Sequence, residues 1–394
     1  MNRAWTEFLQ RLDAALGEAE AQDRRRALRP LARLPGGRVS LNDGRVLVDV
    51  SSNDYLGLAL NPKVRLRAAE YAERLGGSAP ASRLVSGTLP EHLEVEQRLA
   101  AFKRTEAALL FASGWQANSS VLPALIDLMA GPVKVFADRL NHASLHAGLA
   151  QAGQRQIRFR HNDLDHLERQ LQAPENQGRT RLIVTESVFS MDGDRADLPG
   201  LLALADRYDA LLYIDEAHAT GVLGPGGAGL AAALPKGAPV IVMGTLGKAL
   251  GGFGAYVAGP RALTDALVQR CGGFIYSTAP PPAVLGALDA ALDLVPDMDA
   301  ERARLLDAAA RVRAAAEARD LPTFGSTTQI VPIGLGEERR ALDAMKTLED
   351  AGLLAVAIRP PTVPEGASRL RVSLSAAHDD QVIDRLVEAI RAIR

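Results

Sequence analysis

Short apolar runs alternate with longer amphipathic stretches through the middle of this chain. They occupy residues 107–111, 133–136, 182–185, 211–214, 240–243 and 255–258. Continuous apolar runs of this length are typical of strands buried on both faces, and their alternation with helical stretches predicts βαβ units. We therefore expect an α/β fold with a mostly parallel, doubly wound central sheet flanked by helices.

The two ends of the chain have different patterns. Apolar residues near the N-terminus recur at helical spacing, at Trp5, Phe8, Leu9, Leu12 and Leu16. This spacing predicts an amphipathic helix that ends before the break at Pro35-Gly36-Gly37. Beyond residue 282 come a long helical region rich in Ala and Arg and two further strands, near residues 330–333 and 370–374. We expect a helical arm at residues 1–50, a large α/β domain at 51–285 and a small α+β domain at 286–394.

The composition restricts the class of protein. With 394 residues, of which 47% are hydrophobic, the chain can bury a large core and form more than one domain. A formal net charge of -2 provides no overall positive field for nucleic acid or an anionic membrane. Cys271 is the only cysteine, so no intrachain disulfide forms, and neither a membrane span nor a signal peptide is evident. We expect a cytoplasmic protein with no metal, nucleic-acid or membrane partner.

Two polar groups follow neighbouring apolar runs. Asp215 stands at the end of the run 211–214, in Asp215-Glu216-Ala217-His218, and Lys248 lies just beyond the run 240–243. In open α/β sheets, ligands bind outside the carboxyl ends of the strands. Pyridoxal phosphate needs a lysine that holds it covalently and an acid that keeps its pyridine nitrogen protonated, so that the ring can accept carbanion electrons. Lys248 and Asp215 fit these two roles.

Other interpretations of the same residues are weaker. A strand-end Asp is often a cap, and a lysine between glycines is often a solvated loop residue. A nucleotide-binding P-loop would need Gly in place of Val242 and Ser or Thr in place of Ala249. The stretch 224–229 spells GxGxxG, but it lies well past its strand and lacks the downstream acid, so we interpret it as a flexible loop.

Three motifs resemble the α-oxoamine synthases, a family of fold-type I pyridoxal phosphate enzymes. They are Thr185-Glu186-Ser187-Val188-Phe189-Ser190-Met191-Asp192-Gly193-Asp194, Asp215-Glu216-Ala217-His218-Ala219-Thr220-Gly221 and Thr245-Leu246-Gly247-Lys248. The resemblance covers nearly the whole chain, from residues 51–57 to 374–378. It implies a transferase that condenses an amino acid with an acyl thioester and releases carbon dioxide. Residues 357–364 look most like the biotin-pathway members that join L-alanine to a pimeloyl group carried by coenzyme A (pimeloyl-CoA) or by acyl carrier protein (pimeloyl-ACP).

The resemblance also implies roles for individual residues. Beside Lys248 and Asp215, the predicted catalytic residues are His142, whose flat ring is suited to stacking on the cofactor, and His218, which would contact its phenolic oxygen together with Ser190. The residues implied for the cofactor phosphate are Ser113, Gly114, Trp115, Thr245 and, from the neighbouring subunit of a homodimer, Ser277 and Thr278. The residues implied for substrates are Asn53 and Arg359 for the amino acid carboxylate and Arg29 for the acyl donor.

The chain departs from the family in one loop. Many members carry consecutive glycines where this chain has Ser78-Ala79-Pro80-Ala81, and proline stiffens the loop, which leaves the acyl-chain preference open. The same motifs also fit relatives that use glycine or serine, such as 2-amino-3-ketobutyrate ligase or serine palmitoyltransferase. A catalytically silent scaffold is a further alternative, but it predicts the loss of the lysine, the aspartate or a histidine, and all are present.

Overall fold

The computed structural model describes residues 2–129 and 131–393. Their contacts divide the chain into two compact units. The sheet unit comprises residues 53–190 and 194–305, and the terminal unit comprises residues 2–52, 191–193 and 306–393. The sheet unit extends to residue 305 because α10 (Pro282–Leu294) packs on α2 (Pro62–Leu75) and α3 (Pro90–Lys103). The domain boundaries predicted at residues 50 and 285 stay a prediction.

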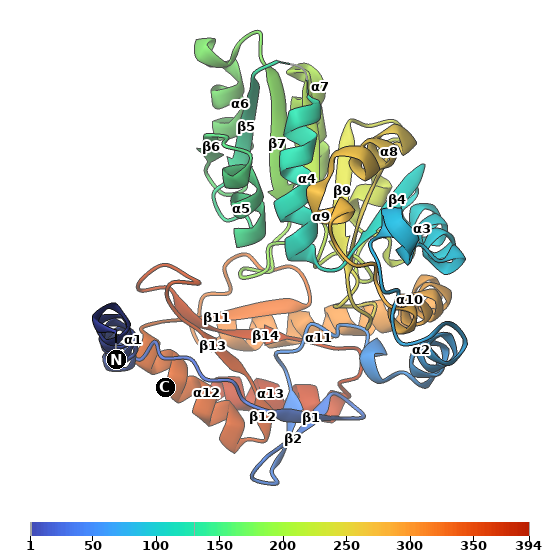
Figure 1. Cartoon of the computed structure of the whole chain (residues 1–394). Coiled ribbons are helices and arrows are strands. Elements are labelled where there is room, and N and C mark those ends of the chain that lie inside the picture. Colours follow the sequence, from blue (N-terminus) through green and yellow to red (C-terminus); the bar gives the residue numbers. More distant parts are fainter. Residues whose placement is uncertain (1, 130, 394) are drawn as a thin grey trace. The chain divides into compact units, whose positions relative to one another are not determined.

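A seven-stranded sheet forms the centre of the sheet unit (Figure 1). In spatial order its strands are β4 (Ala107–Phe111), β10 (Ala255–Gly259), β9 (Val240–Thr245), β8 (Ala210–Asp215), β7 (Thr180–Glu186), β5 (Val133–Asp138) and β6 (Gln156–Phe159). Among these strands, β10 alone runs opposite to the other six. The predicted α/β fold is confirmed, and each of the six apolar runs is a strand. The seventh strand, β6, was not predicted because Gln156 and Arg158 interrupt its apolar pattern.

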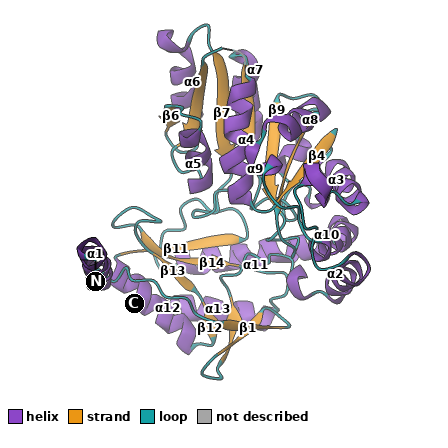
Figure 2. Cartoon of the chain, viewed as in Figure 1, coloured by secondary structure: helices purple, strands orange, loops and turns teal. Residues whose placement is uncertain are grey.

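Each face of this sheet carries its own apolar core. Leu212 and Ile214 pack on one face, with α6 (Leu164–Gln172) and α7 (Leu198–Arg207). Tyr213, between them in sequence, points to the other face, where it joins residues of α4 (Gly114–Leu128) and α5 (Ala143–Gln151). Figure 2 shows helices along the orange strands of this unit. The remaining α-helices that lie wholly in this unit are α8 (Arg261–Arg270) and the short α9 (Gly272–Ile275). Burial on both faces explains why the parallel strands are continuously apolar.

The terminal unit contains two small sheets. One has the order β1 (Leu31–Leu34), β2 (Arg38–Leu41), β3 (Val46–Asp49) and β12 (Leu353–Leu354); the other has the order β11 (Ile330–Gly336), β14 (Ser368–Ser373) and β13 (Val356–Ile358). The helices are α1 (Arg3–Ala21), α12 (Glu338–Asp350) and α13 (Asp380–Arg391), while α11 (Asp299–Glu317) begins in the sheet unit. The predicted N-terminal helix is therefore present, but residues 31–49 contain three strands, and Pro35-Gly36-Gly37 is the turn between β1 and β2. Among the described residues, no helix is both long enough and apolar enough to cross a bilayer.

Candidate active site

Three polar side chains end neighbouring strands at one edge of the seven-stranded sheet. Asp215 is the last residue of β8, Thr245 is the last of β9 and Glu186 is the last of β7. Glu186 pairs in register with Asp215, and Lys248 follows three residues after Thr245. Because these strands are parallel, their carboxyl ends meet at the same edge. The edge at which the sequence predicted a ligand site thus carries the predicted lysine and aspartate.

The amine of Lys248 lies against the imidazole of His218. Lys248 Nζ is 2.8 Å from His218 Nε2, and His218 Nδ1 is 2.6 Å from the hydroxyl of Tyr55, which donates to Asn53 Oδ1 at 3.0 Å. Tyr55 has one hydroxyl hydrogen, and Asn53 Oδ1 can only accept, so that hydrogen points to Asn53. His218 Nδ1 then donates to Tyr55, and Nε2 faces the Lys248 amine. This chain of hydrogen bonds orients the lysine amine.

A second group of hydrogen bonds surrounds Asp215, which is 4% exposed. Its Oδ1 accepts from the backbone N–H of Ala217, and its Oδ2 accepts from Asn118 Nδ2, both at 2.8 Å. Asn118 Nδ2 also lies 2.9 Å from Ser144 Oγ, which is 2.7 Å from His142 Nδ1. The structure therefore connects two of the predicted residues, Asp215 and His142, through two side chains that the sequence did not indicate.

His142 is the N-cap of α5, and the residue is exposed. Desolvation of the imidazole by the surrounding protein lowers its pKa; the negative charge of Asp215 opposes this effect, and the positive charge of Lys248 adds to it. The ring of Trp115 approaches it edge-on, with centroids 6.5 Å apart. A neutral, flat ring at this edge is suited to stacking on an aromatic cofactor.

The start of α4 forms a turn next to the end of β9. Ser113 is its N-cap, and Ser113 Oγ accepts from the backbone N–H of Gln116 at 3.1 Å. A Cβ at Gly114 would lie 2.6 Å from Thr245 Cγ2, so only glycine lets this turn approach β9 so closely. Gln116 Nε2 also donates to Ser277 Oγ. Hydroxyls and a helix N-terminus thus gather as phosphate binding requires, and together with Lys248 and Asp215 they fit pyridoxal phosphate.

The other predicted residues lie in different surroundings. Ser190 follows β7 in a turn closed by the hydrogen bond from Phe189 N to Asp194 O at 3.1 Å, and Thr278 is exposed, bridged to Ser82. Arg29 and Arg359 belong to the terminal unit. Arg29 forms two hydrogen bonds to the Glu349 carboxylate, of 2.8 and 2.9 Å, and Arg359 donates to the carbonyl of Asp23. Their roles stay predictions.

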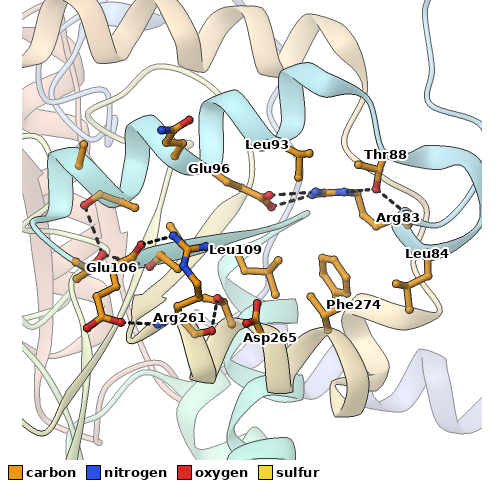
Figure 3. A pocket seen from close by; sticks show the side chains of 18 residues that line it. Arg83, Leu84, Thr88, Leu93, Glu96, Glu106, Leu109, Arg261, Asp265 and Phe274 are labelled. Atoms are coloured by element: carbon orange, nitrogen blue, oxygen red, sulfur yellow. Dashed lines mark hydrogen bonds and ion pairs between the residues drawn. The ribbon is translucent and has the colours of Figure 1, made fainter.

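A cavity of about 630 Å³ in the sheet unit has a different character (Figure 3). None of the predicted catalytic, cofactor-binding or substrate-binding residues lines it. Two of its arginines are held by its own wall: Arg83 meets the Glu96 carboxylate at 2.8 and 3.0 Å, and Arg261 meets the backbone carbonyl of Glu106 at 3.1 Å. The close-up shows the Arg83 guanidinium facing Glu96, above the Phe274 ring. This cavity therefore offers no chemistry that competes with the strand-end site.

Sequence reasoning did not assign roles to several residues at the site. Glu186 is 2% exposed, and its Oε1 accepts from the backbone N–H of His142 at 2.6 Å. Burial raises the pKa of Glu186 well above its usual value, and the nearby charge of Asp215 raises it further. Its position at the end of an apolar run was a usable signal, the same one that identified Asp215. Asn118 gave a weaker signal, as a polar residue on an apolar helix face.

Comparison with known proteins agrees with this geometry. Residues 45–390 match the family described as aminotransferase class I and II, and the chain belongs to that family. The 8-amino-7-oxononanoate synthase of Gluconacetobacter diazotrophicus is 57% identical over 389 residues, which are 98% of this chain and 97% of the relative. Identity of this extent puts the chain among the 8-amino-7-oxononanoate synthases and confirms the family resemblance seen in the motifs.

Solved structures confirm the fold-type I architecture. A serine palmitoyltransferase from S. paucimobilis, described with a bound PLP–myriocin adduct, has a TM-score of 0.88 at 26% identity and covers 97% of this chain and 96% of its own. An 8-amino-7-oxononanoate synthase from Francisella tularensis has a TM-score of 0.75 at 27% identity, with 88% and 97% covered.

Proposed function

We propose that this protein uses pyridoxal phosphate to condense L-alanine with a pimeloyl thioester, giving 8-amino-7-oxononanoate, carbon dioxide and the free thiol carrier, as a step of biotin biosynthesis. The observation that carries the proposal is a lysine amine oriented by His218 at the sheet edge that Asp215 occupies, in a chain 57% identical to a named 8-amino-7-oxononanoate synthase. The carrier, coenzyme A or acyl carrier protein, is part of the proposal to be tested.

Each predicted residue has a task in this reaction. Pyridoxal phosphate, when bound, supplies an electron sink that stabilises negative charge at the amino acid Cα. The Asp215 carboxylate keeps the proton on the pyridine nitrogen, and the His142 ring covers one face of the pyridine and excludes water from it. Ser113, Thr245 and the N-terminus of α4 bind the phosphate. The cofactor is thus bound at two places, its pyridine nitrogen by the Asp215 carboxylate and its phosphate by the start of α4.

The remaining residues handle the substrate and its proton. Arg359 and Asn53 bind the alanine carboxylate, which aligns the Cα–H bond for removal. Lys248 takes that proton at Nζ, next to His218 Nε2, and returns it after carbon dioxide has left. The carbon nucleophile formed in between attacks the thioester carbonyl, and the thiol departs. His218 and Ser190 contact the phenolic oxygen, and Arg29 meets the acyl donor.

A homodimer is part of the proposal. Large apolar side chains are exposed on the segments around the expected phosphate residues, among them Tyr276 (87%) and Val85 (79%). Exposed apolar side chains of this size are typical of surfaces that another protein covers. A second copy of the chain that covers these side chains would bring Ser277 and Thr278 to its partner's phosphate. The cytoplasmic location stays a prediction.

The decisive experiment combines spectroscopy and product analysis. Purified protein with pyridoxal phosphate is expected to gain visible absorbance and to convert L-alanine with pimeloyl-CoA or pimeloyl-ACP into 8-amino-7-oxononanoate, detected by mass. Lys248→Ala is expected to lose the lysine-dependent absorbance. Its turnover is expected to fall at least about 10³-fold, because the proton-transfer group is gone. Lys63→Ala, an exposed lysine on α2, is the control and is expected to keep both. Full activity of Lys248→Ala would refute the assignment.

The similarity to serine palmitoyltransferase supports one rival within the enzyme class. The same protein is therefore assayed with L-serine or glycine and with palmitoyl-CoA or acetyl-CoA. We expect the alanine and pimeloyl pair to give the highest kcat/KM. Turnover of serine or glycine that exceeds that of alanine would move the protein to the serine palmitoyltransferase or 2-amino-3-ketobutyrate ligase type.

A further inference from the structure

Asn118 on α4 contacts both sides of the proposed cofactor site through a single buried amide. It is 1% exposed. From one nitrogen, Nδ2, it donates to Asp215 Oδ2 at 2.8 Å and to Ser144 Oγ at 2.9 Å. Asp215 is the group expected at the pyridine nitrogen, and Ser144 is bonded to His142, the ring expected on the pyridine face. One amide therefore links the two groups that would hold the same ring.

Tyr213 fixes which way this amide points. Its hydroxyl donates to Asn118 Oδ1 at 2.9 Å, and Tyr213 is fully buried two residues before Asp215, on the same face of β8. Burial, and then the charge of Asp215, hold the pKa of Tyr213 well above its usual value, so the hydroxyl keeps its hydrogen and remains a donor. An amide oxygen only accepts, so it faces Tyr213 and the nitrogen faces Asp215.

Ser144 continues the same directionality to His142. Since Ser144 Oγ accepts from Asn118, its own hydrogen can point to His142 Nδ1 at 2.7 Å, and the backbone N–H of Ser144 points to the same nitrogen at 3.2 Å. An imidazole nitrogen that accepts two donors carries no hydrogen. His142 is therefore neutral with its hydrogen on Nε2, which agrees with the lowered pKa of this ring.

We infer that Asn118 and Tyr213 are positioning residues, which hold the Asp215 carboxylate and the His142 ring in one fixed relation on either side of the cofactor. This inference rests on the proposed function, since it needs a pyridine ring between the two groups. Neither residue touches the reacting atoms. Their effect is to prevent the carboxylate from rotating away from the pyridine nitrogen, a preorganisation that a single missing hydrogen bond would weaken.

Tyr213→Phe tests this inference, because it removes one hydroxyl and keeps the ring that fills the core. Tyr256→Phe is a matched control: Tyr256 is also fully buried on a strand of the same sheet, and its hydroxyl bonds to Thr220 at 2.7 Å. In the holoenzyme we expect Tyr213→Phe to raise the dissociation constant for pyridoxal phosphate about tenfold. We also expect the pH titration of the visible absorbance to shift by about one pH unit. The factor by which kcat falls is expected to exceed the factor by which KM changes. Tyr256→Phe is expected to change neither the dissociation constant nor the titration.

Ser144→Ala is the second variant, which keeps the inference testable if Tyr213→Phe folds poorly. It removes the hydroxyl between Asn118 and His142 and is expected to shift the same titration. Unchanged titrations in both Tyr213→Phe and Ser144→Ala would overturn the inference, because a purely structural role predicts lower melting temperatures without a change in the absorbance titration. A titration shift in Tyr256→Phe equal to that in Tyr213→Phe would overturn it as well. A wild-type protein that binds no pyridoxal phosphate would instead refute the proposed function itself.

Discussion

His161 is a partly buried imidazole held between two carboxylates. Its Nδ1 lies 3.0 Å from Asp138 Oδ1, and its Nε2 lies 2.8 Å from Asp194 Oδ2. Burial alone would lower its pKa, but the hydrogen bonds and charges of Asp138 and Asp194 outweigh burial and raise the pKa to about 10. A His with a raised pKa stabilises the fold fully below its unfolded pKa of about 6.5, and that stabilisation is lost as pH rises to about 10.

We therefore predict that the free energy of unfolding falls between pH 7 and pH 9 by up to about 1.4 kcal/mol per pH unit from this one residue. Urea unfolding of wild type and of His161→Gln, each with saturating cofactor, measures the free energy of unfolding at each pH. The decrease of this free energy with pH is expected to be smaller in the variant. His146→Gln is the control, because His146 is partly exposed and bonds only to Gln156 through its ring. Equal slopes in wild type and His161→Gln would contradict the prediction.

At single positions, the sequence predicted the polar residues that follow an apolar run. Lys248 and Asp215 follow such runs, and each reaches the sheet edge expected for it. Asn118 and Tyr213 could not be predicted in the same way, because their bond joins residues 95 positions apart and depends on how α4 lies on β8. A buried polar pair of this kind is specified by packing between elements, which no periodicity in one segment encodes.

The helix α3 is joined to the end of β8 by an ion pair that is entirely buried. Lys103 Nζ lies 2.7 Å from Glu216 Oε2, both side chains are 0% exposed, and Lys103 also donates to the carbonyl of Ala228. A Cβ at Gly229 would lie 2.1 Å from Glu216 Oε2, so glycine is required where this loop crosses the pair. The GxGxxG stretch, expected to be a flexible loop, is instead packed over a buried charge.

We predict that Lys103→Met destabilises the protein by about 3–5 kcal/mol, because it leaves the Glu216 carboxylate buried without a cation. Chemical unfolding of the purified variant measures the loss. The double variant Lys103→Met with Glu216→Gln is expected to recover part of it, since no uncompensated charge remains, and Lys63→Met serves as an exposed control. A loss below about 1 kcal/mol in Lys103→Met would show that the pair contributes little.

Among the elements, the fully buried strands were predictable and the short, partly exposed strands were not. All six runs of the main sheet were found because burial on both faces makes them continuously apolar. β2 and β6 alternate polar or charged with apolar residues, and no side chain of β1 is buried, so pairing partners decide the structure of these strands. The same reason explains why residues 31–49 were included in a helical arm.

The whole molecule, as proposed, is a homodimer in which each site is completed by its partner's Ser277 and Thr278. Within one chain, however, Gln116 donates to Ser277 Oγ next to the Ser113 turn. This contact supports the opposite arrangement, in which both hydroxyls bind the phosphate of their own chain. The two arrangements differ in what happens when a defective lysine and defective hydroxyls are placed on different subunits.

Subunits that carry Lys248→Ala and subunits that carry Ser277→Ala with Thr278→Val are coexpressed with different tags, and heterodimers are isolated by both tags. If the hydroxyls act on the partner, one of the two sites has both an intact lysine and intact hydroxyls, so we predict about half of the wild-type activity. If they act within their own chain, neither site is intact, and the activity stays at the level of the two parent homodimers. Light scattering establishes that the purified species is a dimer, and a monomer with full activity would exclude a shared site altogether.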